Sequence, residues 1–133
     1  MSLLKTMEIS ASGLTAQRLR LDIIANNLAN AETTRTSEGT PYRRQVPIFR
    51  EILDQVSGMP RGVEVIGIIK DNSPFRMVYD PGHPDANLEG YVLYPNVNPV
   101  VEMTDMISAT RSYEANLTLI TSAKSMFLKA LEI

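Results

Sequence analysis

Residues 4–30 read LKTMEISASGLTAQRLRLDIIANNLAN, and this stretch decides the fold. Its seam positions recur at alternating steps of three and four, the spacing of a coiled coil. These positions are Leu4, Met7, Ala11, Leu14, Arg18, Leu21, Ala25 and Leu28. Only Arg18 interrupts the pattern. Ser2 is predicted to cap the start of the helix, and the polar residues Asn26, Asn27 and Asn30 are predicted to end it.

The last third of the chain repeats this pattern. The positions are Met103, Met106, Thr110, Tyr113, Leu117, Ile120, Lys124, Phe127 and Leu131. Ile107 and Leu128 widen the apolar stripe. Asn98 followed by Pro99 is a suitable cap and first-turn residue. A second long helix is therefore predicted to run to the end of the sequence.

The middle of the chain has a different composition. All prolines and most glycines lie between Gly39 and Pro99. Strands are predicted at residues 42–52, where Pro47 restricts the strand to a sheet edge, at 63–69, and at 75–79. Residues 80–84, with the sequence DPGHP, are predicted to form a tight turn.

These patterns predict an α+β fold. Long N- and C-terminal helices form a coiled-coil-like pair, and a small β-rich insert joins them. The expected units are residues 1–31 for the N-terminal helix, 32–98 for the β-rich and loop region, and 99–133 for the C-terminal helix.

Composition argues against several classes of protein. A formal net charge of −2 provides no positive field to attract nucleic acid. The sequence has no cysteine and one histidine, which removes thiolate chemistry and sites built on two imidazoles. No stretch is long and apolar enough to cross a membrane, and no cleaved secretory signal is visible. We expect no enzyme activity, cofactor, bound metal, nucleic-acid partner or membrane insertion.

The candidate chemical groups have simpler interpretations. Asp80, His83 and Asp85 resemble a metal site but have the composition of a turn. Glu102, Asp105 and Glu114 are too widely spread around their helix to act as a pair, and we interpret them as capping or solvated residues. Arg43, Arg44 and Arg50 are interpreted as part of a solvated edge strand.

The apolar stripes leave two arrangements open. The helices can pack on the β insert as an ordinary α+β monomer, or part of their apolar surface can meet other chains. Arg18 and Lys124 interrupt the seams, where they either fix register and partner choice or extend to water.

Two separated segments carry a family resemblance. Residues 25–31, ANNLANA, are followed by Glu32-Thr33-Thr34, and the C-terminal third contains GYVLYPNVN (90–98), EMTDMI (102–107) and RSYEANL (111–117). Both resemble the terminal signatures of the flagellar rod and hook proteins, the axial proteins of the bacterial flagellum. The short length of the chain and the sequence PNVN at residues 95–98 favour a proximal rod member.

This resemblance implies a structural subunit of the drive shaft that transmits torque from rotor to hook and filament. It implies contacts with other copies, with other rod proteins and with the rotor ring and export gate. It also implies export through the flagellar type III apparatus without a cleaved signal peptide, and a place in the rod within the cell envelope or periplasmic space. The terminal helices would line the inner tube, and the β region would face outward.

The residues expected to form the assembly interface are Leu4, Met7, Leu14, Leu21, Asn26, Asn27, Leu28, Asn30, Met103, Met106, Ile107, Tyr113, Asn116, Leu117, Ile120, Phe127 and Leu131. The alternatives are another axial subunit of the rod and hook family or a non-flagellar helical module that binds a protein. An enzyme remains an option only if Asp80, His83 and Asp85 bind a metal.

Overall fold

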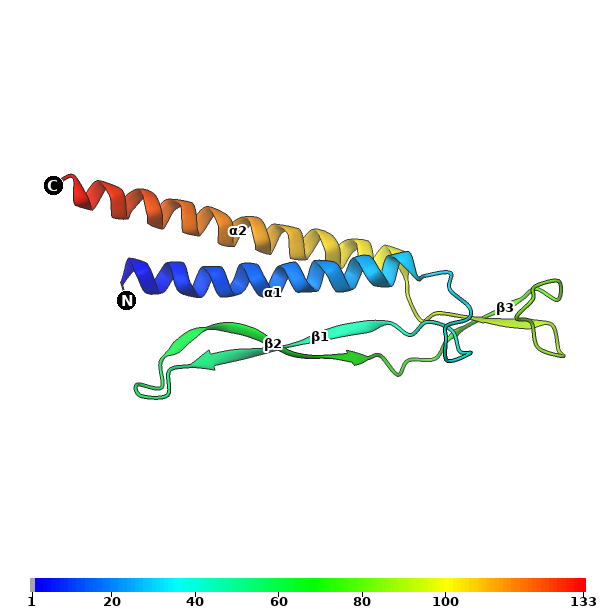
Figure 1. Ribbon diagram of the computed structural model, residues 1–133. Coiled ribbons are helices and arrows are strands. Elements are labelled where there is room, and N and C mark those ends of the chain that lie inside the picture. The colour runs from blue at the N-terminus through cyan, green and yellow to red at the C-terminus, as the bar shows by residue number, and fades with distance from the viewer. Residues whose placement is uncertain (1) are drawn as a thin grey trace.

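The computed structural model describes residues 2–133 and contains two long helices and two β-hairpins. Helix α1 (Leu3–Ala29) and helix α2 (Pro99–Leu131) lie side by side and run in opposite directions (Figure 1). The predicted α+β class, with a long pair of terminal helices around a small β-rich insert, is confirmed.

Both helix starts follow the predicted local chemistry. The Ser2 hydroxyl accepts a hydrogen bond from the Lys5 amide at 3.2 Å. The Asn98 side chain accepts bonds from the Val100 and Val101 amides, and Pro99 occupies the first turn. These bonds satisfy amide groups that have no partner inside a helix. At the other end of α1, the Asn30 side chain donates to the Asn26 carbonyl at 2.9 Å.

The insert forms two separate two-stranded sheets. Strands β1 (Gln45–Leu53) and β2 (Pro60–Lys70) are antiparallel, and Gln45 pairs with Lys70 at one end of the ladder. Strands β3 (Arg76–Tyr79) and β4 (Tyr91–Tyr94) form the second sheet. Three strands were expected, with boundaries a few residues away. Strand β4 was not expected, because its stability depends on pairing with β3.

The β1–β2 hairpin covers the side of α1 that faces away from α2 (Figure 1). The hairpin lies close to α1 at Gly62, whose φ of 142° is unfavourable for other residues. A Cβ atom there would collide with the Ser12 side chain. The Ser12 hydroxyl accepts a hydrogen bond from the Val63 amide at 3.0 Å. Helix α1 is thus the middle layer of three.

The predicted seams were only partly correct, because the contact face of each helix is rotated. In α2 the buried residues are Glu102, Ala109 and Ala123, each one position before a predicted seam residue. The buried residues of α1 are Ser10, Gly13, Ala16, Ile23, Ile24 and Asn27. Small side chains allow close approach of two helices, but a search for large apolar residues gives them little weight.

The two charged seam residues lie outside this contact. Arg18 and Lys124 are both exposed. Their side chains therefore reach water, and the interpretation that they sit in a dry core and fix register is wrong for the contact within this chain. Neither helix within residues 2–133 is long and apolar enough to cross a membrane.

Candidate assembly interface

The contact between α1 and α2 leaves much of the apolar stripe of α2 uncovered. Of the predicted seam residues, Met106, Tyr113 and Ile120 are half-buried. Leu117 is 48% exposed and Leu131 is 69% exposed. The stripe is therefore wider than the intrachain contact. Exposed apolar residues grouped in this way are typical of surfaces that other proteins cover.

Seven exposed apolar residues of α2 form two rows, and Val100, Phe127 and Leu131 lie outside them. The first flank consists of Met103, Ile107, Leu117 and Leu128, and the second flank consists of Val101, Leu119 and Met126. At 100° per residue, the two flanks lie on opposite sides of the line that joins the helix axes. A neighbour on each side would cover both.

Between the flanks lies a third row of small and polar side chains. This hydroxyl stripe consists of Thr104, Ser108, Arg111, Ala115, Thr118, Ser122, Ser125 and Lys129. All eight residues are exposed. No acidic residue interrupts the stripe. It faces away from α1, because the buried residues lie on the opposite side of the helix.

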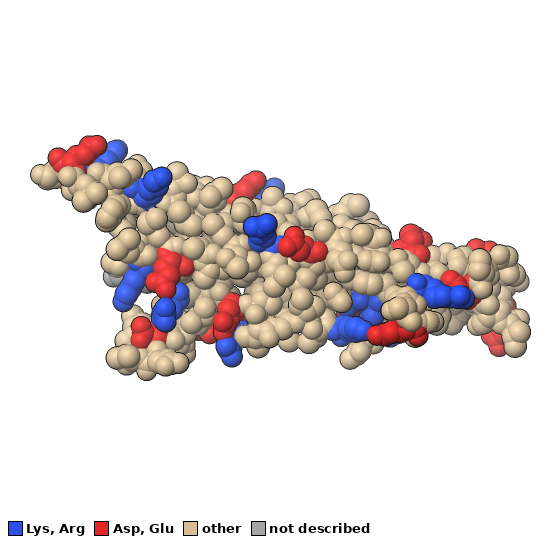
Figure 2. Space-filling view, in the orientation of Figure 1, with Lys and Arg blue, Asp and Glu red and all other residues tan. Residues whose placement is uncertain are grey.

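Charge is scarce along the middle of the helix pair. Residues 9–17 of α1 and residues 115–123 of α2 contain no Asp, Glu, Lys or Arg. These segments overlap in space, because Gly13 lies against Asn116. Figure 2 shows the face of the helix pair that is turned to the viewer as mostly uncharged. Neighbours can therefore pack on this region with little loss of charge hydration.

The end of α2 extends past the start of α1 (Figure 1). Residues 124–133, here named the C-terminal overhang, are all exposed. The overhang carries the apolar residues Met126, Phe127, Leu128, Leu131 and Ile133.

The predicted interface residues fall into three groups. The exposed ones are Leu4, Asn26, Met103, Ile107, Leu117, Phe127 and Leu131, and Asn27 is buried. The half-buried ones are Met7, Leu14, Leu21, Leu28, Asn30, Met106, Tyr113, Asn116 and Ile120. The structure brings many of them onto or beside the helix pair, and their role in assembly stays a prediction.

A buried polar junction fixes the helix pair to the insert. The side chain of Asn27 accepts a hydrogen bond from the Gln45 amide at 3.0 Å and donates one to the Gln45 carbonyl at 2.9 Å. It also accepts a bond from the Tyr42 hydroxyl at 2.7 Å. One asparagine thus fixes the end of α1 against the start of β1. Its position in the sequence indicated a role at the helix end, and the family resemblance added Asn27 to the expected assembly interface.

The charged half of the junction surrounds Arg44. Its guanidinium donates to Glu102 at 2.5 Å and to Asp71 at 3.2 Å, and lies 3.7 Å from Asp105. Glu102 is 1% exposed. The interpretation of Arg44 as a solvated strand residue is therefore wrong, as is that of Glu102 as a solvated or capping residue. Glu102 is buried and Arg44 is half-buried against it, because a carboxylate is not stable in a core without a cation.

The other two arginines of that group also have partners. Arg43 donates to the carbonyls of Asp71 and Ser73 and lies 4.2 Å from the centre of the Phe75 ring. It is half-buried, so the solvated interpretation is wrong here too. Arg50 is exposed and pairs with Glu64 across the β1–β2 ladder.

The junction shifts the ionisation of its members. Burial raises the pKa of the Tyr42 hydroxyl, and the charge of Glu102 adds to this effect against the opposing hydrogen bond of Asn26. Burial alone would lower the pKa of Arg44, but the hydrogen bond and charge of Glu102, with those of Asp71, raise it above its usual range. Arg44 therefore stays charged and Tyr42 stays neutral in the junction.

Asp71 gives the junction a predicted acid dependence. Hydrogen bonds from the Ser73 hydroxyl and amide lower the pKa of Asp71, and Arg44 lowers it further. A lowered pKa in the folded chain contributes stability above the ordinary value of about 4, and this contribution is lost as pH falls through the lowered value. The stability difference between the wild-type chain and Asp71→Asn is therefore expected near neutral pH and should disappear at an acidic pH below the lowered value.

Urea unfolding of both chains at the two pH values measures this difference. Because Asp85 also has a lowered pKa, both chains should lose some stability in acid. An equal gap between the two chains at both pH values would contradict the assignment to Asp71.

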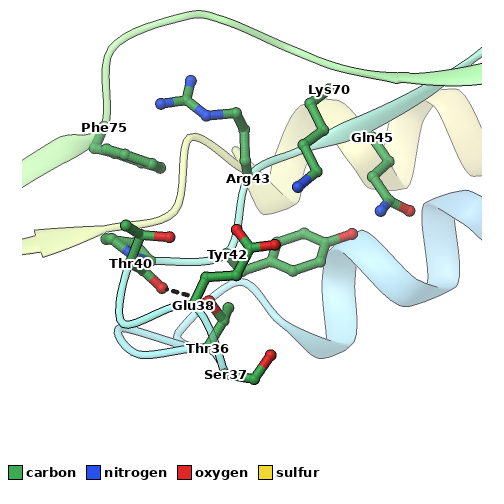
Figure 3. A pocket seen from close by; sticks show the side chains of 10 residues that line it. Thr36, Ser37, Glu38, Thr40, Tyr42, Arg43, Gln45, Lys70 and Phe75 are labelled. Atoms are coloured by element: carbon green, nitrogen blue, oxygen red, sulfur yellow. Dashed lines mark hydrogen bonds between the residues drawn. The ribbon is translucent and has the colours of Figure 1, made fainter.

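A hollow of about 260 Å³ lies beside this junction, between the loop after α1 and the end of β2 (Figure 3). The close-up shows Tyr42 between Glu38 and Gln45, with Lys70 and Arg43 on the β-sheet side. Arg43 is already bonded to backbone carbonyls. This hollow contains the cation Lys70 and the carboxylate Glu38, with no arrangement that resembles a nucleophile and a base.

The turn at residues 80–84 is confirmed, and the side chains of His83 and the neighbouring Asp85 have partners in the fold. The His83 amide donates to the Asp80 carbonyl at 3.1 Å. The His83 ring accepts a bond from the Asp85 amide, and Asp85 pairs with Arg35 and Thr34. Within residues 2–133, no three Asp, Glu, His or Cys side chains gather to hold a metal ion.

Sequence reasoning missed the junction residues Tyr42, Arg44 and Glu102. One signal was available in the sequence. Glu102 lies one turn into an apolar helix and Arg43 and Arg44 precede a strand, so they are candidates for a buried ion pair. The partners are 58 residues apart, however, and nothing local indicates that they meet.

Comparisons with known proteins agree at both ends and over the full length. A family model for flagella basal body rod proteins matches residues 7–35, and one for the C-terminal part of flagellar basal body rod FlgEFG proteins matches residues 88–133. The chain is 49% identical to the flagellar basal-body rod protein FlgC of Borreliella burgdorferi and 48% identical to that of Bacillus subtilis. Each alignment covers all of this chain and 98% or 99% of the relative. The FlgC protein of Salmonella typhimurium is 42% identical, with 98% of it covered. The chain therefore belongs to the FlgC family of flagellar basal-body rod proteins.

Proposed function

We propose that this chain, a structural subunit of the proximal rod of the flagellar basal body, transmits torque by packing the two flanks of α2 against neighbouring rod subunits. The observation that supports this is the pair of exposed apolar rows on a helix whose third side already packs on α1. Neighbours on both sides would close a ring or a helical tube.

The hydroxyl stripe supports one orientation of the subunit, with a particular side of α2 toward the inside of the proposed tube. If both flanks of α2 are covered by neighbours, the row from Thr104 to Lys129 is the part of α2 left for water. We propose that it faces the channel of the rod. Small, polar and non-acidic side chains would present few apolar sites to an unfolded chain in transit. The β1–β2 hairpin would then face outward, because it covers the opposite side of α1.

The role is mechanical in this proposal, with no catalytic step. Torque passes between subunits through contacts that must resist shear, and close-packed side chains resist deformation well. The buried Asn27–Arg44–Glu102 junction would pass the load from the helix pair to the outward hairpin.

The proposed partners follow from membership of this family and from the resemblance in sequence. They are other copies of the chain, other rod proteins, and the rotor ring and export gate at the proximal end. We propose that the chain reaches the rod within the cell envelope, in the periplasmic space, through the flagellar type III apparatus and without a cleaved signal peptide. The absence of cysteine suits a chain that travels unfolded into an oxidising compartment.

The test is a pair of neighbouring substitutions on α2. Leu117→Asp places a charge in the first flank, where a covered leucine contributes about 1.5–3 kcal/mol to each contact. Its incorporation into basal bodies should fall about tenfold or more, since 1.4 kcal/mol is a factor of ten. Cells that carry the variant in place of their own rod protein should swim poorly. Immunoblots of purified basal bodies and swimming in soft agar measure the two effects.

Thr118→Asp is the matched control. It adds the same charge at the next residue, in the hydroxyl stripe, and should leave incorporation close to that of the wild-type chain. Both side chains are exposed in the free subunit, so circular dichroism of the purified variants should show equal helix content. Normal incorporation of Leu117→Asp would contradict the proposed packing of the flanks.

A further inference from the structure

Each flank of α2 contains one methionine. Met103 belongs to the first flank and Met126 to the second, and each side chain is 55% exposed. At 1.5 Å per residue they are separated by roughly 34 Å along the helix axis. They also lie on opposite sides of the helix pair, so two different neighbours would cover them. The free subunit therefore presents one thioether on each surface that is proposed to bind a neighbour.

The fold divides the methionines of the chain by exposure. Among residues 2–133, Met59 and Met77 are also exposed, at 59% and 61%. Met59 lies directly before β2 and Met77 lies in β3, so both are outside the flanks. Met7 and Met106 are half-buried. A small oxidant reacts with a sulfur atom that it can reach, so the exposed methionines are the expected sites of oxidation.

The oxidation of a methionine by hydrogen peroxide needs no catalytic group from the chain. One oxygen atom of the peroxide forms a bond with the thioether sulfur, the O–O bond breaks, and the other oxygen leaves as water. The sulfur loses two electrons and the peroxide gains them. The product, methionine sulfoxide, has a polar and chiral side chain, and reductases can convert it back to the thioether.

A sulfoxide is unsuited to the proposed contacts of the flanks. Its oxygen accepts hydrogen bonds in water, and burying it without a donor is unfavourable. All other members of the two flanks are valine, isoleucine or leucine, and their side chains provide no donor. A neighbour that covers an oxidised flank therefore buries an unpaired oxygen atom.

The fold of the subunit itself should tolerate the change. Met103 and Met126 are exposed in the free chain, so water can hydrate the oxygen of each sulfoxide. Neither residue belongs to the buried contact between α1 and α2. The unfavourable effect of oxidation therefore arises only when another subunit covers the flank.

We propose that Met103 and Met126 are modification sites, at which a peroxide converts the free subunit into a form that the growing rod excludes. A neighbour that covers a flank also shields its sulfur atom, so the modification acts on subunits before they assemble. This inference rests on the proposed function, because it requires the flanks to be contact surfaces.

Peptide mass mapping measures the reactivity of each methionine. The purified, folded chain is treated mildly with hydrogen peroxide and sampled over time. Met103 and Met126 should gain oxygen faster than Met7 and Met106, and circular dichroism should show unchanged helix content. Oxidation of Met7 and Met106 at the same rate as the flank residues would overturn the assignment of the sites.

Competition within one cell measures the effect on assembly. Cells that lack methionine sulfoxide reductases produce the wild-type chain together with the double variant Met103→Leu/Met126→Leu, and mass spectrometry distinguishes their peptides. Relative incorporation is the ratio of the two chains in purified basal bodies, divided by their ratio in whole cells. When most of the free wild-type chain is oxidised, a peroxide pulse should shift this value about tenfold toward the leucine variant. Comparing the same cells with and without peroxide removes any difference in basal incorporation.

The double variant Met59→Leu/Met77→Leu is the matched control. It removes two equally exposed methionines outside the flanks and keeps Met103 and Met126. In competition with the wild-type chain, its relative incorporation should not change with peroxide. An unchanged value for Met103→Leu/Met126→Leu despite oxidation of the wild-type chain, or an equal shift for both double variants, would overturn the proposal.

The modification and the proposed function fail in different ways. If the flanks do not form the rod, Leu117→Asp incorporates normally in the absence of peroxide. If only the modification is wrong, Leu117→Asp still loses incorporation, while peroxide leaves the competition between the wild-type chain and Met103→Leu/Met126→Leu unchanged.

Discussion

Replacing Arg44 by methionine is expected to destabilise the folded chain by about 3–5 kcal/mol, because the substitution leaves a buried carboxylate without its cation. Glu102 is 1% exposed, and its other hydrogen bond comes from Asn27 at 3.3 Å. Asp71 and Asp105 lose the same partner. Urea unfolding of the full chain, followed by circular dichroism, measures the loss.

The double variant Arg44→Met with Glu102→Leu is the control for this prediction. Apolar residues of similar size often replace a buried ion pair at little cost. The double variant should therefore recover most of the lost free energy of unfolding. A loss of less than about 1 kcal/mol for Arg44→Met, the value typical of an exposed ion pair, would contradict the burial of this pair. A double variant no more stable than the single variant would contradict the assignment to Glu102.

Gly13→Leu is expected to have the second largest effect, about 2–3 kcal/mol, through overpacking of the α1–α2 contact. Gly13 is buried, and a Cβ atom there would lie 2.9 Å from Asn116 Nδ2 and 3.1 Å from its Cγ. A leucine adds three further carbon atoms in the same place, so the helices must separate. Urea unfolding reports the lost stability, and basal-body immunoblots report the loss of incorporation.

Gly13→Ala separates this effect from a change in helix propensity. Alanine favours a helix over glycine by about 1 kcal/mol, and its Cβ meets the end of a side chain that can rotate. We expect Gly13→Ala to be close to neutral. Adding Asn116→Ala to Gly13→Leu should restore part of the stability. Full stability of Gly13→Leu alone would show that the helices are farther apart than described.

Most of the secondary structure could be predicted, because it depends on neighbours in the chain. Ser2 and Asn98 cap their helices through amides two or three residues away. The β-branched run beginning at Val63 and the turn at Asp80 follow from local backbone preferences. The four-residue strand β4 was missed because its stability depends on pairing with β3.

The candidate interface could be predicted only in part. Apolar spacing identified Met103, Leu117 and Leu131 as members of a stripe, and these are the residues that the fold leaves exposed. It assigned to the same stripe residues such as Tyr113 and Ile120, which the helix pair half-covers. Periodicity predicts that a surface is apolar, but it does not indicate whether the same chain or another molecule covers that surface.

By itself, the sequence determined where both helices begin, that a β-rich insert separates them, and which family the chain resembles. Only the tertiary structure decided which side of each helix packs inside the chain. That choice depends on Gly13, Ala109 and Ala123, whose small size permits close approach but gives little hydrophobic signal. It also depends on Asn27 and Glu102, which are 75 residues apart and become partners only when the folded chain brings both ends of the insert together.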